Sequence, residues 1–80
     1  MRLRRPKIIV RPLPGNIAGL ACKAKNTIEI DPNLWPRKEL EVLVHEALHL
    51  ADWPMSEQKV KYRAKYISDV LWRVGFRKKA

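Results

Sequence analysis

Short alternations of apolar and polar residues open the chain, and two long stretches with helical spacing close it. Lys7 to Arg11 (KIIVR) is a β-branched run that predicts a strand. Pro12 to Asn16 (PLPGN) breaks regular structure, because proline and glycine interrupt strands and helices alike. Residues 17–26 alternate imperfectly and lead into Thr27–Asp31 (TIEID), whose isoleucines alternate with polar residues. The last two runs predict a β-hairpin.

The first helical stretch runs from Arg37 to about Asp52, after a turn whose Pro36 suits the first position of a helix. The stretch has neither glycine nor proline, and its apolar residues recur at spacings of three and four. This spacing predicts a core-facing stripe of Leu40, Leu43, Ala47, Leu50 and Ala51.

The second helical stretch follows an interruption at DWPM. Ser56 is a good N-cap, and Glu57 in the first turn suits the helix dipole. The pattern continues to about Val74, where Gly75 supplies the stop. Because the connection is short, the two helices are expected to be antiparallel neighbours. The apolar seam expected on this helix consists of Val60, Ala64, Ile67, Leu71 and Val74.

Length and composition fit one small α+β domain, residues 1–80, with a basic arm at 1–6 and a basic tail at 76–80. The apolar share of 46% is that of a globular protein. The single cysteine, Cys22, cannot form an internal disulfide, which favours a reducing cytoplasm. No apolar run is long enough for a membrane span or a signal peptide, so no membrane partner is expected.

Both histidines of the chain lie in the stretch LVHEALHLADW, residues 43–53. His45 and His49 are four residues apart, so a helix places them one turn apart on one side. Glu46 is turned by about 100° from His45, beside the position that an ion would take. In the pattern H-E-x-x-H, two imidazoles hold Zn²⁺, the ion lowers the pKa of a water, and the glutamate takes the proton of that water. The uncharged neighbours of the motif favour a zinc site over a chance pair of histidines.

A catalytic zinc usually has three protein ligands and one open position. The chain has no third histidine, which leaves carboxylates and Cys22 as candidates. Glu57 is favoured, because the seam of the second helix reaches it when extended backwards by three residues. Glu57 is therefore expected to be buried, and the short connection between the helices is expected to bring it beside His49. Asp52 is the fallback, although its place at a helix end also explains it. An exposed Glu57 that complements the helix dipole and pairs with Lys61 is the alternative interpretation.

The residues VLVHEALHLAD followed by SEQKV resemble a gluzincin-type zinc metallopeptidase in its smallest form, such as minigluzincins, SprT-like cores and short phage-borne relatives. The resemblance spans about Ala18 to Val74. It implies a zincin-like domain in which His45, His49 and Glu57 are zinc ligands and Glu46 is the general base. The chain departs from larger gluzincins at Lys61, which stands four residues after the glutamate ligand, where they carry an acidic residue.

The same resemblance implies hydrolysis of a peptide bond in an extended peptide or protein substrate, in a bacterial cell or a phage-infected host. In such domains the substrate adds as a strand to the sheet. The strand that would receive it is Thr27, Ile28, Glu29 and Ile30, or its hairpin partner. No tyrosine or histidine is expected on the Glu57 face to stabilise an oxyanion.

The charge of the chain favours polyanions, since 17 Lys and Arg against 8 Asp and Glu give +9. The alternative function is therefore a basic module that binds nucleic acid or a host protein and holds a structural, non-catalytic metal. The nucleic-acid contacts expected for it are Arg2, Arg4, Arg5, Arg77, Lys78 and Lys79. A third interpretation is a metal-free helical hairpin in which the motif is incidental.

Overall fold

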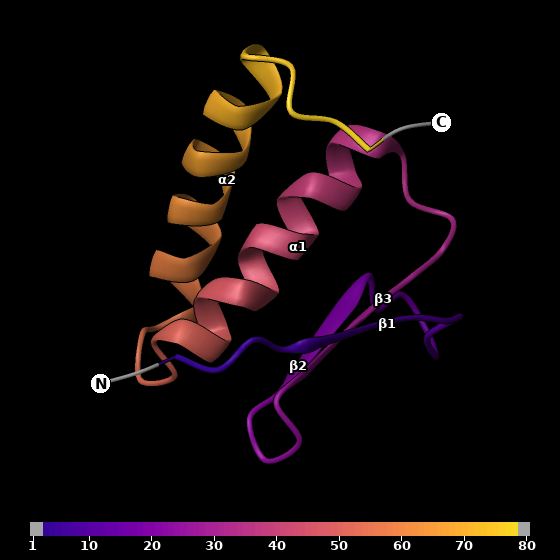
Figure 1. Cartoon of the computed structure of the whole chain (residues 1–80), viewed down its shortest axis with the longest axis vertical. Helices are drawn as coiled ribbons and strands as arrows, with labels where there is room; N and C mark the ends of the chain where they lie inside the picture. Colours follow the sequence, from indigo (N-terminus) through magenta and orange to yellow (C-terminus); the bar gives the residue numbers. More distant parts are fainter. Residues whose placement is uncertain (1–2, 79–80) are drawn as a thin grey trace.

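The computed structural model describes residues 3–78, which form three strands followed by two helices (Figure 1). The predicted α+β order of a strand, a hairpin and two antiparallel helices is confirmed. In chain order the elements are β1 (Lys7–Val10), β2 (Gly19–Cys22), β3 (Thr27–Ile30), α1 (Pro36–Ala51) and α2 (Glu57–Arg73).

The sheet is mixed, and its strand order is β1-β3-β2. The hairpin strands β2 and β3 pair antiparallel, with Gly19 opposite Ile30, whereas β1 pairs parallel to β3. The hairpin turn reverses at Asn26, whose φ of 52° is one that asparagine tolerates better than most residues. Because β3 is hydrogen-bonded on both sides, the free edges of the sheet belong to β1 and β2.

Helix α1 lies between the sheet and α2 (Figure 1), and it packs against β2 and β3 on one side and against α2 on the other. The most deeply buried apolar side chains come from all three layers. Ile28 and Ile30 of β3 are 2% and 1% exposed, and Val60 of α2 is fully buried. Val42 of α1 lies between them in sequence and is also buried. The core is therefore small, as expected for a chain of this length.

The helix boundaries follow local signals that the sequence carries. Pro36 occupies the start of α1, where its missing N–H would have no helical partner. The Ser56 hydroxyl accepts a hydrogen bond from the Lys59 backbone N–H at 3.2 Å, which caps α2. Gly75 ends α2 with a φ of +94°, in the left-handed region that glycine favours. All three predicted signals are confirmed.

The two predicted apolar stripes are wrong in part. In α1 the buried residues are Val42 and Glu46, while Ala47 and Ala51 are exposed. The reason is that α1 is covered on two sides, by the sheet and by α2. Its buried residues therefore lie on two faces and not on the single predicted stripe. In α2 the seam continues from Ala64 to Ser68, whose hydroxyl donates to the Lys65 carbonyl at 3.2 Å.

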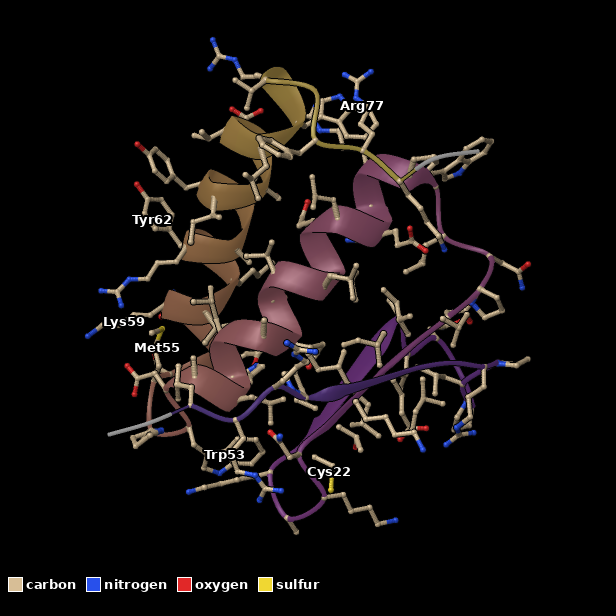
Figure 2. All side chains as sticks on the ribbon, in the orientation of Figure 1. Cys22, Trp53, Met55, Lys59, Tyr62 and Arg77 are labelled. Atoms are coloured by element: carbon tan, nitrogen blue, oxygen red, sulfur yellow. The ribbon has the colours of Figure 1, made fainter. Side chains whose placement is uncertain are left out.

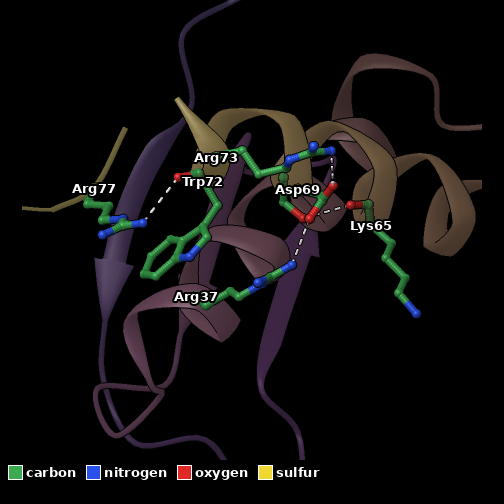
Figure 3. Close-up of polar contacts among 7 residues, drawn as sticks. Arg37, Lys65, Asp69, Trp72, Arg73 and Arg77 are labelled. Carbon is green, nitrogen blue, oxygen red and sulfur yellow. Dashed lines mark hydrogen bonds and ion pairs between the residues drawn. The ribbon is translucent and has the colours of Figure 1, made fainter. Parts of the chain in front are cut away.

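This internal hydrogen bond lets a serine occupy the seam, because its polar group is satisfied without water. The predicted seam residues Ile67 and Val74 are instead 37% and 69% exposed. Near the same end of the helix pair, the Arg37 guanidinium lies 2.7 Å from the Asp69 carboxylate, which Arg73 also approaches at 3.6 Å (Figure 3). This ion pair joins the first turn of α1 to the last turns of α2.

Candidate metal centre

The two histidines of α1 face the beginning of α2. Their ring centroids lie 4.9 Å apart, and their side chains are 19% and 20% exposed. One helical turn separates His45 from His49, so both rings leave α1 on the same side. Each ring turns its Nε2 atom toward the same carboxylate on α2.

That carboxylate belongs to Glu57, the first residue of α2. Its Oε1 lies 2.8 Å from Nε2 of His45, and its Oε2 lies 2.7 Å from Nε2 of His49. The Ser56 cap and the reversal of the chain between the helices bring Glu57 to this position. The side chain is 67% exposed, so the expectation that it would be buried is wrong, although it does face the histidines.

The charge state of Glu57 follows from these contacts. Loss of water around its carboxylate raises its pKa, but the hydrogen bond and charge of His45, followed by those of His49, outweigh this effect. The pKa of the Glu57 carboxyl therefore lies below its usual value. The group is ionised near neutral pH, which is the form that a metal requires.

The three side chains fit a zinc ion by their chemistry. Their candidate ligand atoms all lie within 4.8 Å of one another, and they are two imidazole nitrogens and one carboxylate oxygen. Two histidines and one glutamate form a ligand set that catalytic zinc uses, and it leaves one position open for water or substrate. A bound metal would take the place of the direct contacts between the two imidazoles and the Glu57 carboxylate.

Glu46 lies beside this cluster and is buried, with 9% of its surface exposed. Burial raises the pKa of its carboxyl, and the nearby Glu57 charge adds to the rise. The His45 and His49 charges and a backbone hydrogen bond from Ala21 act in the opposite direction without cancelling it. A glutamate with a raised pKa is suited to accept and return a proton near neutral pH.

Gly19 of β2 allows α1 to come this close to the sheet. A Cβ atom at Gly19 would lie 2.5 Å from Val42 Cγ1 and 3.1 Å from Glu46 Cγ. Both separations are shorter than ordinary carbon–carbon contacts. The sequence carried a signal for this feature, since an isolated glycine within a strand often marks a close approach of another element, but the site prediction did not include Gly19.

The other ligand candidates lie outside the cluster. Asp52 is the C-cap of α1 and is exposed, with its backbone N–H bonded to the Leu48 carbonyl at 2.9 Å. Cys22 ends β2 and alternates with Ala21, so it lies on the face of the sheet opposite Gly19. Of the predicted third ligands, the structure brings only Glu57 to the two histidines.

Of the two strands expected to receive a substrate, the first has no free edge. Thr27, Ile28, Glu29 and Ile30 form the central strand β3, which is hydrogen-bonded to β1 and β2 and has no free edge. The free edge next to the cluster is that of its hairpin partner β2. A cavity of about 490 Å³ extends along this edge and is lined by Leu20, Ala21, both histidines, Glu46, Trp53, Met55 and Glu57.

The four predicted nucleic-acid contacts that the structure describes do not form one surface. Arg4 and Arg5 lie beside the hairpin turn, where the Asn26 side chain donates to the Arg5 carbonyl at 3.1 Å. Lys78 lies beside the first turn of α1, with its Nζ 3.7 Å from the Glu39 carboxylate. Arg77 lies at that same end, with its guanidinium 3.9 Å from the centre of the Trp72 ring (Figure 3). The remaining two, Arg2 and Lys79, lie outside the described residues.

No protein-family model, no curated protein and no solved structure matches this chain. Among residues 3–78, no helix is both long and apolar enough to cross a bilayer.

Proposed function

We propose that this protein is a small zinc-dependent metallopeptidase or peptidase-like hydrolase. The observation that carries the proposal is the meeting of His45, His49 and Glu57 across two helices, with the buried Glu46 beside them. A chance H-E-x-x-H helix would not need a carboxylate from a second helix within 2.8 Å of both imidazoles. The single cysteine is compatible with action in the cytoplasm.

His45, His49 and Glu57 would hold the zinc, which when bound polarises the carbonyl of the scissile bond and lowers the pKa of a water. Glu46 accepts a proton from the attacking water at its carboxylate. The water oxygen bonds to the carbonyl carbon, and the C–N bond breaks. Glu46 then returns the proton to the departing nitrogen, so the products are a carboxylate and an amine.

The β2 edge positions the substrate in this proposal. An extended peptide can add to this edge through backbone hydrogen bonds, as strands do in β-augmentation. The cavity beside β2 contains His45, Glu46 and Glu57, so a strand bound there passes the proposed reacting groups. Trp53 and Met55, which line the same cavity, lie in the connection between α1 and α2 (Figure 2).

The test is the Glu46→Gln variant, measured for zinc content and for cleavage of an unstructured peptide pool. Zinc content should stay at one ion per chain, because Glu46 is not a ligand. Cleavage should fall by at least ~100-fold, the usual contribution of a general base. Glu39→Gln, which changes a carboxylate in the first turn of the same helix, should retain cleavage. Undiminished cleavage by Glu46→Gln, or a parent protein that binds no zinc, would contradict the proposal.

A second candidate function is binding of single-stranded nucleic acid, and the outer face of α2 supports it. Tyr62 and Tyr66 are 76% and 67% exposed and lie one helical turn apart, opposite the seam that packs on α1. Figure 2 shows Tyr62 and Lys59 directed away from α1. Exposed aromatic rings flanked by cations are typical of surfaces on which bases stack. A cleft of about 240 Å³ beside the tyrosines also contains Arg37 and Lys65.

Binding of a labelled single-stranded oligonucleotide would test this second function. Affinity should fall steeply as salt rises. Replacing both Tyr62 and Tyr66 by alanine should lower it by roughly 30-fold or more, because each stacked base contributes about 1–3 kcal/mol. Glu46→Gln should bind as the parent does. Equal affinity of the double alanine variant would contradict this role for α2.

A further inference from the structure

The space around the proposed metal centre has two parts with different chemistry. One is the cavity of about 490 Å³ that contains Trp53 and Met55, which we term the tryptophan cavity. The other is a cavity of about 350 Å³ that contains Lys38 and Lys61, which we term the lysine cavity. Both are lined by the same four residues, Gly19, His45, Glu46 and Glu57. The cavities therefore lie on either side of the groups that would carry out the reaction.

The lysine cavity is lined by two lysines and by the carboxylates of Glu41, Glu46 and Glu57. Lys61 carries the one positive charge of this cavity that has no assigned partner. Lys38 lies 4.0 Å from the Glu41 carboxylate on the next turn of α1. Glu57 is held by the two histidines. None of the ion pairs found among residues 3–78 includes Lys61, which is exposed one turn after Glu57 on α2. Its ammonium group is thus available to an anion that enters the cavity.

We propose that Lys61, supported by Lys38, makes the lysine cavity a subsite for an acidic side chain of the peptide substrate. This inference rests on the proposed peptidase function and adds the class of peptide that the site selects. The tryptophan cavity takes an apolar side chain on the other side of the cleaved bond, because Trp53 and Met55 present aromatic and apolar surface there.

The direction of β2 assigns the two side chains to positions along the peptide. The lysine cavity lies beside Ile17, Ala18 and Gly19, and the tryptophan cavity lies beside Gly19, Leu20 and Ala21. A strand added antiparallel to β2, the slightly more stable pairing, runs from the Cys22 end toward the Gly19 end. The apolar residue therefore precedes the cleaved bond, and the acidic residue follows it.

The experiment measures peptide binding by calorimetry to the zinc-loaded Glu46→Gln protein, so that no peptide is cleaved. Three peptides are compared, with glutamate, glutamine or lysine after a central leucine. The glutamate peptide should bind about three- to fivefold tighter than the glutamine peptide at low salt, and the difference should shrink as salt rises. The lysine peptide should bind most weakly.

Two further substitutions in the same background identify the lysine responsible. Lys61→Gln should bring the glutamate-to-glutamine affinity ratio close to one, and Lys61→Glu should reverse the order of the glutamate and lysine peptides. Lys65→Gln is the matched control, since Lys65 lies one turn further along α2, outside the lysine cavity, and the ratio should not change.

Three results would overturn the inference. They are equal binding of the glutamate and glutamine peptides by the parent, an unchanged ratio in Lys61→Gln, and an equal loss of affinity for all three peptides in that variant. Zinc content and cleavage by the wild-type protein show whether such a result contradicts the acidic subsite alone or the proposed peptidase function as well. A wild type that holds zinc and cleaves all three peptides without preference contradicts the inference alone. A wild type that neither holds zinc nor cleaves any of them contradicts both.

Discussion

Among the single residues, Glu46 combines a proposed chemical role with a penalty to stability. Its carboxylate is buried between α1 and β2, and burial is the main reason why its pKa is raised above 4.5. A buried charge is less stable than a solvated one. The same environment prepares the group to take up a proton, so activity and stability place opposite demands on this position.

Glu46→Gln should therefore raise the thermal unfolding midpoint of the metal-free protein at pH 7. We expect a rise of roughly 2–6 °C, for a relief of about 0.5–1 kcal/mol. The pKa of the Glu46 carboxyl is higher in the folded parent than in the unfolded chain, so the folded parent binds more protons at pH values between these two pKa values. The stability of the parent, relative to that of the variant, therefore falls as pH rises through this range. Thermal unfolding of both proteins from pH 4 to 8 in excess chelator would measure the difference between their midpoints. A difference that grows toward acid pH would contradict this expectation.

Gly19 is the second residue on which the site depends. Gly19→Ala should destabilise the protein by about 1–3 kcal/mol, because the new methyl group overlaps Val42 and crowds Glu46. Leu20→Ala is a suitable control, since Leu20 is 45% exposed on the other face of β2. Denaturant unfolding would compare the two variants, and a Gly19→Ala protein as stable as the parent would show that α1 does not need this close approach.

At the level of secondary structure, the beginning of α2 determines whether the candidate centre forms. Ser56→Ala removes the side-chain cap and should reduce stability by ~1 kcal/mol. It should also weaken zinc binding, because Glu57 follows the cap directly and frayed helix ends do not hold a ligand in place. Ser56→Asp keeps a capping oxygen and should restore both properties. Thermal unfolding and competition with a zinc-binding dye would measure them, and normal zinc affinity in Ser56→Ala would contradict this role of the cap.

The elements themselves could be predicted because each has a local cause. Pro36, Ser56 and Gly75 mark helix ends through backbone geometry that depends on neighbouring residues only. The strand order could not be predicted, because the pairing of β1 with β3 depends on contacts far apart in the chain. For this reason the sequence leaves β3 and its hairpin partner β2 as alternative edge strands, and only the structure shows that β3 lies in the centre of the sheet.

The candidate site could also be predicted only in part. The spacing of His45 and His49 follows from helix geometry, and the short connection correctly indicated that Glu57 would face them. The reason given for Glu57 was wrong, since its side chain remains mostly exposed. Lys61 could not be placed from the sequence, because its position beside Glu46 depends on how the two helices pack.

Considered as a whole, the molecule has little core from which to derive stability. The largest fully buried side chains of the described residues are Ile28, Ile30 and Val60. Zinc held between α1 and α2 would join the two helices in the folded state alone, so metal binding adds directly to the free energy of unfolding.

We therefore expect the unfolding midpoint to depend on zinc. At a free zinc concentration 100 times the Kd, the added stability is about 2.7 kcal/mol, which corresponds to a rise of roughly 10–20 °C for a domain of this size. His49→Ala should show little of this rise, and magnesium should not reproduce it, because imidazole is a poor ligand for magnesium. An identical midpoint in zinc and in excess chelator would favour the metal-free interpretation.

Native mass spectrometry of the zinc-equilibrated protein tests the central claim most directly, because it counts the ions bound to each folded chain. The account predicts one zinc per chain in the wild type and in Asp52→Ala, and loss of that zinc in Glu57→Ala. A wild-type protein without bound zinc, or a Glu57→Ala protein that retains it as firmly as the wild type, would contradict it.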